Sequence, residues 1–297
     1  ISTTMVFVNL LTAILNDKNI SKFMVPIVAD EARTFGLQSL FRKFAIYSPF
    51  GQLYSPEDKE ELLYYKESKN GQILEEGINE AGAISSWIAA GTSYANHGVP
   101  MIPFYIFYSC FGFQRIGDLI WSAGDSRAKG FLLGATAGRT TLSGEGLQHE
   151  DGSSHILFST VPNCVAYDPA YGYELSVIIE NGFKRMYEDN EDVFYYITVM
   201  NENYIQPEMP KNTQQGIIKG MYRLLETPKN DISVQLMGSG TILNEVIKAS
   251  KLLHDDWDIS STIWSVTSYT ELRKNALECE KNNTIKVKVE PGEPRIE

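Results

Sequence analysis

The sequence has few cysteines, no excess of basic residues and no long apolar run. Its three cysteines, Cys110, Cys164 and Cys279, are widely spaced and form no CxxC pair, which indicates reduced thiols in a cytoplasmic protein. Lysine and arginine number 26 against 37 acids, and this balance argues against nucleic acid, whose phosphates attract clustered cations. The most apolar run, from Val99 to Phe113, is about fifteen residues, which is too short to cross a membrane.

Several catalytic signatures are also missing. Gly238 and Gly240 follow a strand-like segment, but Leu243 stands where a dinucleotide fingerprint needs its third glycine. The string HEDGSSH has Ser153 where a zinc protease needs its second histidine, and no G-x-S-x-G motif occurs. These departures argue against nicotinamide, zinc-protease and serine-hydrolase chemistry, and we assign no metal ligand to this chain. The start ISTTMVF, without an initiator methionine, suggests the interior of a longer protein.

What is present fits a globular α/β protein. Apolar residues make up 43% and charged residues 21% of the 297 residues, which is ordinary for a chain of about two domains. Apolar strand-like runs alternate with helical patterns, an order that predicts a parallel sheet flanked by helices. The polar, proline-containing stretch NENYIQPEMPKNTQQG predicts a linker. We therefore expect one domain over residues 1–209 and a partial second α/β domain over residues 210–297.

The segment from Gly77 to Phe113 is the first candidate for chemistry. Glu80 lies among small residues that predict a closely packed helix, so its carboxylate should be poorly solvated. An aromatic run follows and predicts a buried strand that ends near Cys110, with Phe111 at its C-terminal edge, where parallel sheets bind ligands. Most helical glutamates are simply solvated and most aromatic strands are simply core, so composition alone does not establish a site.

The loop RTTLSGEGLQHEDGSSH is the second candidate. It is rich in glycine and polar residues, and it carries His149 and His155, whose side chains can transfer protons near neutral pH. A short strand that ends at Asp30 and Glu31 offers two further carboxylates.

Five segments together resemble a known family. They are IVADEARTFG, ILEEGINEAGA, MIPFYIFYSCFGFQRIGDL, GRTTLSGEGLQHEDGSSH and PNCVAYDPAYGYE, and they are similar to the pyrimidine-binding domain of homodimeric bacterial pyruvate dehydrogenases. VQLMGSGTILNEV and SVTSYTELRK resemble the start of that family's transketolase-like C-terminal domain, whereas the residues after Cys279 depart from its pattern. The resemblance implies a thiamine-diphosphate-binding fold and the decarboxylation of pyruvate.

The resemblance also assigns roles to single residues. It implies that Glu80 hydrogen-bonds the aminopyrimidine ring of thiamine diphosphate and that Phe111 stacks on that ring. Tyr108 and His149 match residues near the reacting centre, where His149 could bind the developing alkoxide. Glu31 matches a pocket carboxylate close to the thiazolium ring of the cofactor. His155 matches a transketolase-type histidine and is a second choice.

The family needs parts that this sequence does not contain. A separate N-terminal domain holds the diphosphate and its magnesium through a G-D-G motif, which is absent here. The resemblance therefore implies that a complete site needs a homodimer, which serves the dihydrolipoyl acetyltransferase component of a larger complex. Two alternatives remain open, namely a transketolase-like transfer of ketol units and a non-catalytic dimerisation module. A single basic residue of the loop, Arg139, is available to bind a sugar phosphate.

Overall fold

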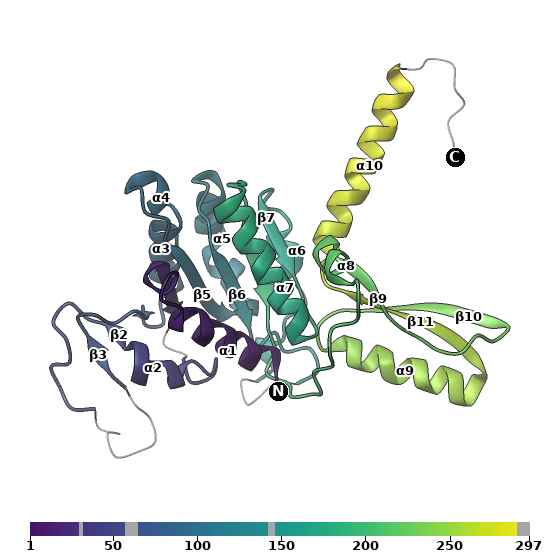
Figure 1. Cartoon of the computed structure of the whole chain (residues 1–297), viewed down its shortest axis with the longest axis horizontal. Coiled ribbons are helices and arrows are strands. Elements are labelled where there is room, and N and C mark those ends of the chain that lie inside the picture. The colour runs from purple at the N-terminus through teal and green to yellow at the C-terminus, as the bar shows by residue number, and fades with distance from the viewer. Residues whose placement is uncertain (30–31, 57–64, 142–145, 290–297) are drawn as a thin grey trace.

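The computed structural model describes residues 1–29, 32–56, 65–141 and 146–289, with side chains given up to residue 284. A six-stranded sheet forms the centre of the first unit (Figure 1), and neighbouring strands are parallel in the order β4-β1-β5-β6-β8-β7. Its strands are β1 (Met24–Val28), β4 (Leu74–Glu75), β5 (Ile102–Tyr108), β6 (Phe131–Ala135), β7 (Cys164–Tyr167) and β8 (Phe194–Thr198). The expected parallel α/β fold is confirmed.

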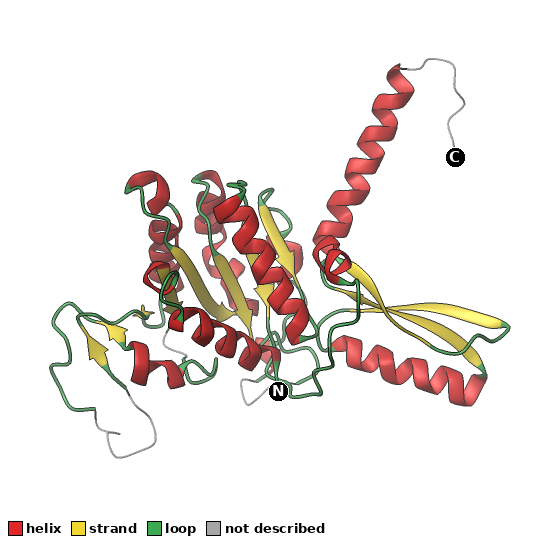
Figure 2. Ribbon diagram, viewed as in Figure 1, coloured by secondary structure: helices red, strands yellow, loops and turns green. Residues whose placement is uncertain are grey.

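Helices cover both faces of this sheet, as the ribbon colours in Figure 2 show. The longer ones are α1 (Thr3–Asn16), α2 (Gln38–Phe44), α3 (Glu80–Gly91), α5 (Ser109–Asp125) and α7 (Gly172–Phe183), which continues into a π-helical turn η3 (Lys184–Glu188). The shorter ones are η1 (Ser21–Phe23), α4 (Ser93–Asn96), η2 (Leu147–His149) and α6 (Ser154–Phe158). A small parallel pair, β2 (Ile46–Tyr47) and β3 (Glu67–Ser68), lies outside the main sheet. No described helix is both long and apolar enough to cross a membrane.

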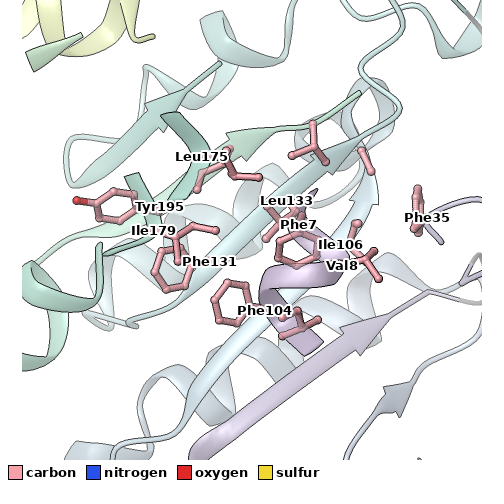
Figure 3. Packing of buried hydrophobic residues seen from close by; sticks show 14 of the residues in the cluster. Phe7, Val8, Phe35, Phe104, Ile106, Phe131, Leu133, Leu175, Ile179 and Tyr195 are labelled. Atoms are coloured by element: carbon pink, nitrogen blue, oxygen red, sulfur yellow. The ribbon is translucent and has the colours of Figure 1, made fainter. Parts of the chain in front are cut away.

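The two faces of the sheet build two separate apolar clusters, because successive side chains of a strand point to opposite sides. In β5, Phe104 and Ile106 join the cluster beneath α1 and α7 (Figure 3), whereas Tyr105 and Phe107 join the cluster beneath α3 and α5. The rings of Phe104 and Phe131 stack with centroids 4.5 Å apart. Burying each such ring contributes about 1.5–3 kcal/mol, so the sheet is held in place from both sides.

One expected boundary is wrong. The aromatic run does not continue as a strand to Cys110, because β5 ends at Tyr108 and α5 begins at Ser109. Phe111 is therefore on the first turn of a helix and not at the end of a strand. Gly112 makes this turn possible, since a Cβ there would overlap the ring of Phe107. Because Gly112 has no Cβ atom, the first turn of α5 can pack directly against the Phe107 ring of β5.

The second unit is a smaller mixed layer. It contains α8 (Gln214–Lys219), β9 (Met221–Glu226), β10 (Ile232–Gly238), α9 (Ile242–Trp257), β11 (Ile259–Val266) and α10 (Tyr269–Val289). β10 and β11 are parallel, as the sequence predicts, but β9 pairs with β11 in the antiparallel direction and was not predicted. For the segment YSPFGQLYSPEDKEELLYYKESKNG the sequence predicts a loop and a short charged helix, and residues 57–64 of that segment lie outside the described residues.

A buried carboxylate joins the two units. Glu174 of α7 has no exposed surface and accepts hydrogen bonds from the backbone N–H groups of Ala170 and Tyr171, at 2.6 and 3.1 Å. Its other oxygen accepts from the hydroxyls of Tyr222 and Ser265 in the second unit, at 2.7 and 2.6 Å. A buried charge is tolerated only when its hydrogen-bonding capacity is filled, and here each unit supplies half of the donors.

Candidate functional site

A hollow of about 160 Å³ lies at the carboxyl ends of β1 and β5. This is the sheet edge at which parallel α/β proteins bind ligands. Its wall combines aromatic rings with a carboxylate, a guanidinium and an imidazole, and its residues are Ala29, Phe35, Ile78, Glu80, Phe107, Tyr108, Phe111, Arg115 and His149. Four of the six residues singled out from the sequence are among them, although they come from three separate segments.

Glu80 is positioned by the start of a helix. α3 begins at Glu80, and the side chain of Asn79 caps it by accepting a hydrogen bond from the Gly82 N–H at 3.0 Å. A carboxylate in the first turn is favoured by the partial positive charge of the helix N-terminus. The Glu80 side chain is 17% exposed and forms an ion pair with Arg115 through Oε1. The expectation of a poorly solvated carboxylate facing a pocket is met.

Aromatic and imidazole rings form the opposite wall. The ring of His149 lies 4.6 Å from that of Tyr108 and 5.0 Å from that of Phe111, measured between centroids. The Arg115 guanidinium lies over the Phe111 ring, with its carbon 4.2 Å from the centroid. Arg115 thus contacts both an acid and an aromatic ring of the hollow, and its role was missed because nothing in the sequence pairs it with either.

His155 does not line this hollow. It is the second residue of the short helix α6, and its Nε2 lies 2.9 Å from the hydroxyl of Thr198 at the end of β8. Thr198 in turn donates to Asp168, which forms a buried ion pair with Arg139. The two loop histidines therefore belong to different clusters. Asp168 and Thr198 were also missed, because each looks like an ordinary strand-end residue in the sequence.

Burial sets the protonation of this second cluster. Desolvation lowers the pKa of His155, although the nearby Asp168 partly opposes that effect. For Asp168, desolvation would raise the pKa, but the charge of Arg139 and the hydrogen bond from Thr198 contribute to outweighing it, and the pKa is lowered. The imidazole is therefore neutral near pH 7 and the carboxylate is charged.

Glu31 lies outside the described residues. Among the residues that are described, no group of three or more His, Cys, Asp or Glu side chains could hold a metal ion.

Two family models match the chain. The model described as "Pyruvate dehydrogenase E1 component middle domain" matches residues 1–207, and the "Transketolase-like TK C-terminal domain" matches residues 220–292. Residues 208–219 lie between the two matches and include the second half of the predicted linker, which spans residues 201–216.

Similar curated proteins carry the same description. The pyruvate dehydrogenase E1 component of Pseudomonas aeruginosa is 61% identical over 100% of this chain, and that of Escherichia coli K12 is 55% identical over 100%. The chain covers 34% of each of these proteins, so it spans about a third of the length of the curated relatives it matches.

Solved structures of transketolases share the fold. The enzyme from Campylobacter jejuni superposes with a TM-score of 0.66 at 14% identity, over 92% of this chain and 36% of that one. A split-gene transketolase described as an inactive β4 tetramer superposes with a TM-score of 0.57 at 14% identity, over 90% of this chain and 72% of that one. At this identity the likeness concerns the fold alone.

Proposed function

Because this chain belongs to the family of the pyruvate dehydrogenase E1 component, we propose that it forms one half of a thiamine-diphosphate site in a longer enzyme. Residues 1–209 are the pyrimidine-binding domain and residues 210–297 begin the C-terminal domain. The whole enzyme decarboxylates pyruvate and passes the acetyl group to lipoamide of the dihydrolipoyl acetyltransferase component. It works as a homodimer, in which another domain holds the diphosphate and magnesium.

One observation carries this proposal, namely that Glu80, Tyr108, Phe111 and His149 surround a single hollow. A pyrimidine is flat and apolar on its faces and has nitrogen atoms along its edge. The hollow offers aromatic rings for the faces and the Glu80 carboxylate for an edge nitrogen, so the residues present fit the group. The small residues at the start of α3 leave the approach to Glu80 open.

The cofactor, when bound, supplies a carbon nucleophile and then accepts the electron pair released by decarboxylation. The chain's own residues hold it and move protons. Arg115 engages Oε1 of Glu80, so Oε2 is the oxygen that would hold a ring nitrogen of the pyrimidine through a hydrogen bond. Phe107 and Phe111 exclude water from that hydrogen bond and strengthen it. His149, across the hollow, donates a hydrogen bond to the oxygen on which negative charge develops.

The transketolase-like alternative is disfavoured by the position of Arg139. Ketol transfer between sugar phosphates requires cations that bind the phosphate. The Arg139 guanidinium instead pairs with Asp168, which is 5% exposed, and its Nε donates to the backbone oxygen of Asp151 at 3.4 Å. The Arg139 guanidinium is therefore engaged by Asp168 and Asp151 and is not available to bind a sugar phosphate.

The test substitutes Glu80 in the full-length protein. Glu80→Ala should lower the pyruvate-dependent reduction of an artificial electron acceptor about a hundredfold, the scale lost with a positioned proton-transfer group. Glu245→Ala removes a carboxylate of α9 that pairs with Lys248, and it serves as the control that keeps wild-type activity. Proton exchange at the thiazolium carbon should slow in the first variant only. Normal exchange in Glu80→Ala would remove Glu80 from this role.

A further inference from the structure

A hydrogen-bonded chain of four side chains lies at the same edge of the sheet as the hollow. His155 Nε2 is 2.9 Å from Thr198 Oγ1, and Thr198 Oγ1 is 2.6 Å from Asp168 Oδ1. The other oxygen of Asp168 accepts from Arg139. These residues come from α6 and from the ends of β6, β7 and β8, so three neighbouring strands converge on one cluster.

The direction of each hydrogen bond follows from the number of protons available. Thr198 has one hydroxyl proton, and the charged Asp168 carboxylate at 2.6 Å is a stronger acceptor than the Tyr167 carbonyl at 3.4 Å. Once that proton points at Asp168, the Thr198 oxygen can only accept from His155. The imidazole must then carry its proton on Nε2.

We propose that Thr198 and Asp168 are positioning residues that hold His155 as the Nε2–H tautomer, so that Nδ1 is its only nitrogen able to accept a proton or hydrogen bond. The inference rests on the proposed function in one respect, since it treats His155 as a residue of the active site. It concerns residues on which the proposed function does not otherwise depend.

Two further features hold the cluster rigid. Asp168 is anchored to the second unit through its backbone, since its N–H donates to the Thr267 oxygen at 2.8 Å and its oxygen accepts from the Gly240 N–H at 3.2 Å. On the other side, the carboxylate of Asp151 accepts from the Ser154 N–H at 3.0 Å and the Ser154 hydroxyl at 2.5 Å, which fixes the start of α6. The ring of His155 also packs on Tyr196, with centroids 5.3 Å apart.

The charges around His155 agree with a neutral ring. Asp168 and Asp151 favour its protonation and Arg139 opposes it, but desolvation is the largest effect and lowers the pKa. A neutral imidazole has two tautomers, and the choice between them decides which nitrogen can act as an acceptor.

The experiment compares variants of the full-length protein. Thr198→Val removes the acceptor of the Nε2 proton, whereas Thr198→Ser restores the hydroxyl without the methyl group. We expect kcat for pyruvate to fall about tenfold or more in Thr198→Val, with KM changing less than about twofold, and to recover in Thr198→Ser. Thr12→Val removes a hydroxyl that bonds only to the Val8 oxygen within α1, and it should leave kcat unchanged.

A second measurement does not depend on turnover. In Asp168→Asn the new amide can donate to Thr198, whose hydroxyl then donates to His155, so the ring proton should move to Nδ1. Neutron diffraction should locate the proton on Nε2 in the wild type and on Nδ1 in this variant. If Asp168→Asn does not fold, the wild-type proton position alone decides, and a proton on Nδ1 overturns the proposal.

The outcomes separate this proposal from the proposed function. If the wild-type protein does not decarboxylate pyruvate, the proposed function is contradicted. A proton located on Nε2 of His155 would still support the proposed tautomer in that case. An active wild type with an equally active Thr198→Val contradicts the positioning role. A kcat that falls in Thr198→Val but does not recover in Thr198→Ser contradicts it as well, because the methyl group and not the hydroxyl would then be responsible.

Discussion

Burial, and not the position near a helix N-terminus, sets the reactivity of the Cys110 thiol. The residue is the second of α5, and the N-terminus of a helix stabilises a thiolate. The side chain is nonetheless buried, and desolvation raises the pKa of its thiol to about 11. Burial therefore leaves the Cys110 thiol unreactive, although the residue is on a helix.

A first prediction follows for thiol reagents. At pH 8 roughly one Cys110 side chain in a thousand is ionised, so native protein should react with iodoacetamide at this position far more slowly than unfolded protein. Because the reactive form is the thiolate, the native rate should rise about tenfold per pH unit until the pH approaches the pKa. Mass spectrometry of the labelled peptide measures the rate, and the unfolded protein is the control. Equal native and unfolded rates at pH 8 would contradict the prediction.

Single residues also show how much of the site can be predicted from the sequence. Glu80, Phe111 and His149 stand out in the sequence as an acid among small residues, an aromatic residue at a strand end and a histidine in a glycine-rich loop. Tyr108 is identified by the resemblance alone, and all four residues line the hollow. Asp168 was not named, because its partner Arg139 is distant in the sequence and only the sheet order brings them together. Pairings between neighbouring strands cannot be predicted from one strand alone.

At the scale of elements, alternation of strands and helices was predictable and their boundaries were not. The aromatic residues of SCFGF have the composition of a strand, yet they form the first turn of α5. Tertiary packing of Gly112 on Phe107 overrides that local preference. β9 was missed for a similar reason, since its short run Met221–Glu226 becomes a strand only through pairing with β11.

A prediction at this scale concerns the close packing of β6. A Cβ at Gly134 would overlap the hydroxyl of Tyr196 and lie 2.8 Å from Cβ of Ser109, so Gly134→Ala must displace β8 or α5. We expect a loss of about 1–3 kcal/mol in the free energy of unfolding, as for other overpacked cores. Gly152→Ala is the matched control, because a Cβ there meets nothing within 4 Å. Urea unfolding measures the stability of both variants. Equal unfolding midpoints would contradict the prediction, because β8 or α5 would then move without a loss of stability.

For the whole molecule, the proposed function makes the hollow one wall of a site. Its described residues include a carboxylate for the pyrimidine but no group of acids or histidines that could hold a metal ion for the diphosphate. The isolated 297-residue chain should therefore show no turnover of pyruvate, whereas the full-length protein should turn over pyruvate with added thiamine diphosphate and magnesium. The same electron-acceptor assay measures both. Turnover by the isolated chain would contradict the half-site proposal.

Glu174 has a consequence for how the molecule unfolds. If the second unit melted first, the hydroxyls of Tyr222 and Ser265 would leave, and half of the donors to a carboxylate inside the first unit would be lost. Burial raises the pKa of Glu174, and a buried carboxyl group that loses its hydrogen-bond partners costs about 1–3 kcal/mol. A state with one unit intact and the other melted is therefore disfavoured. The two units are therefore thermodynamically coupled, and calorimetry should record one cooperative transition whose van't Hoff enthalpy equals the calorimetric enthalpy.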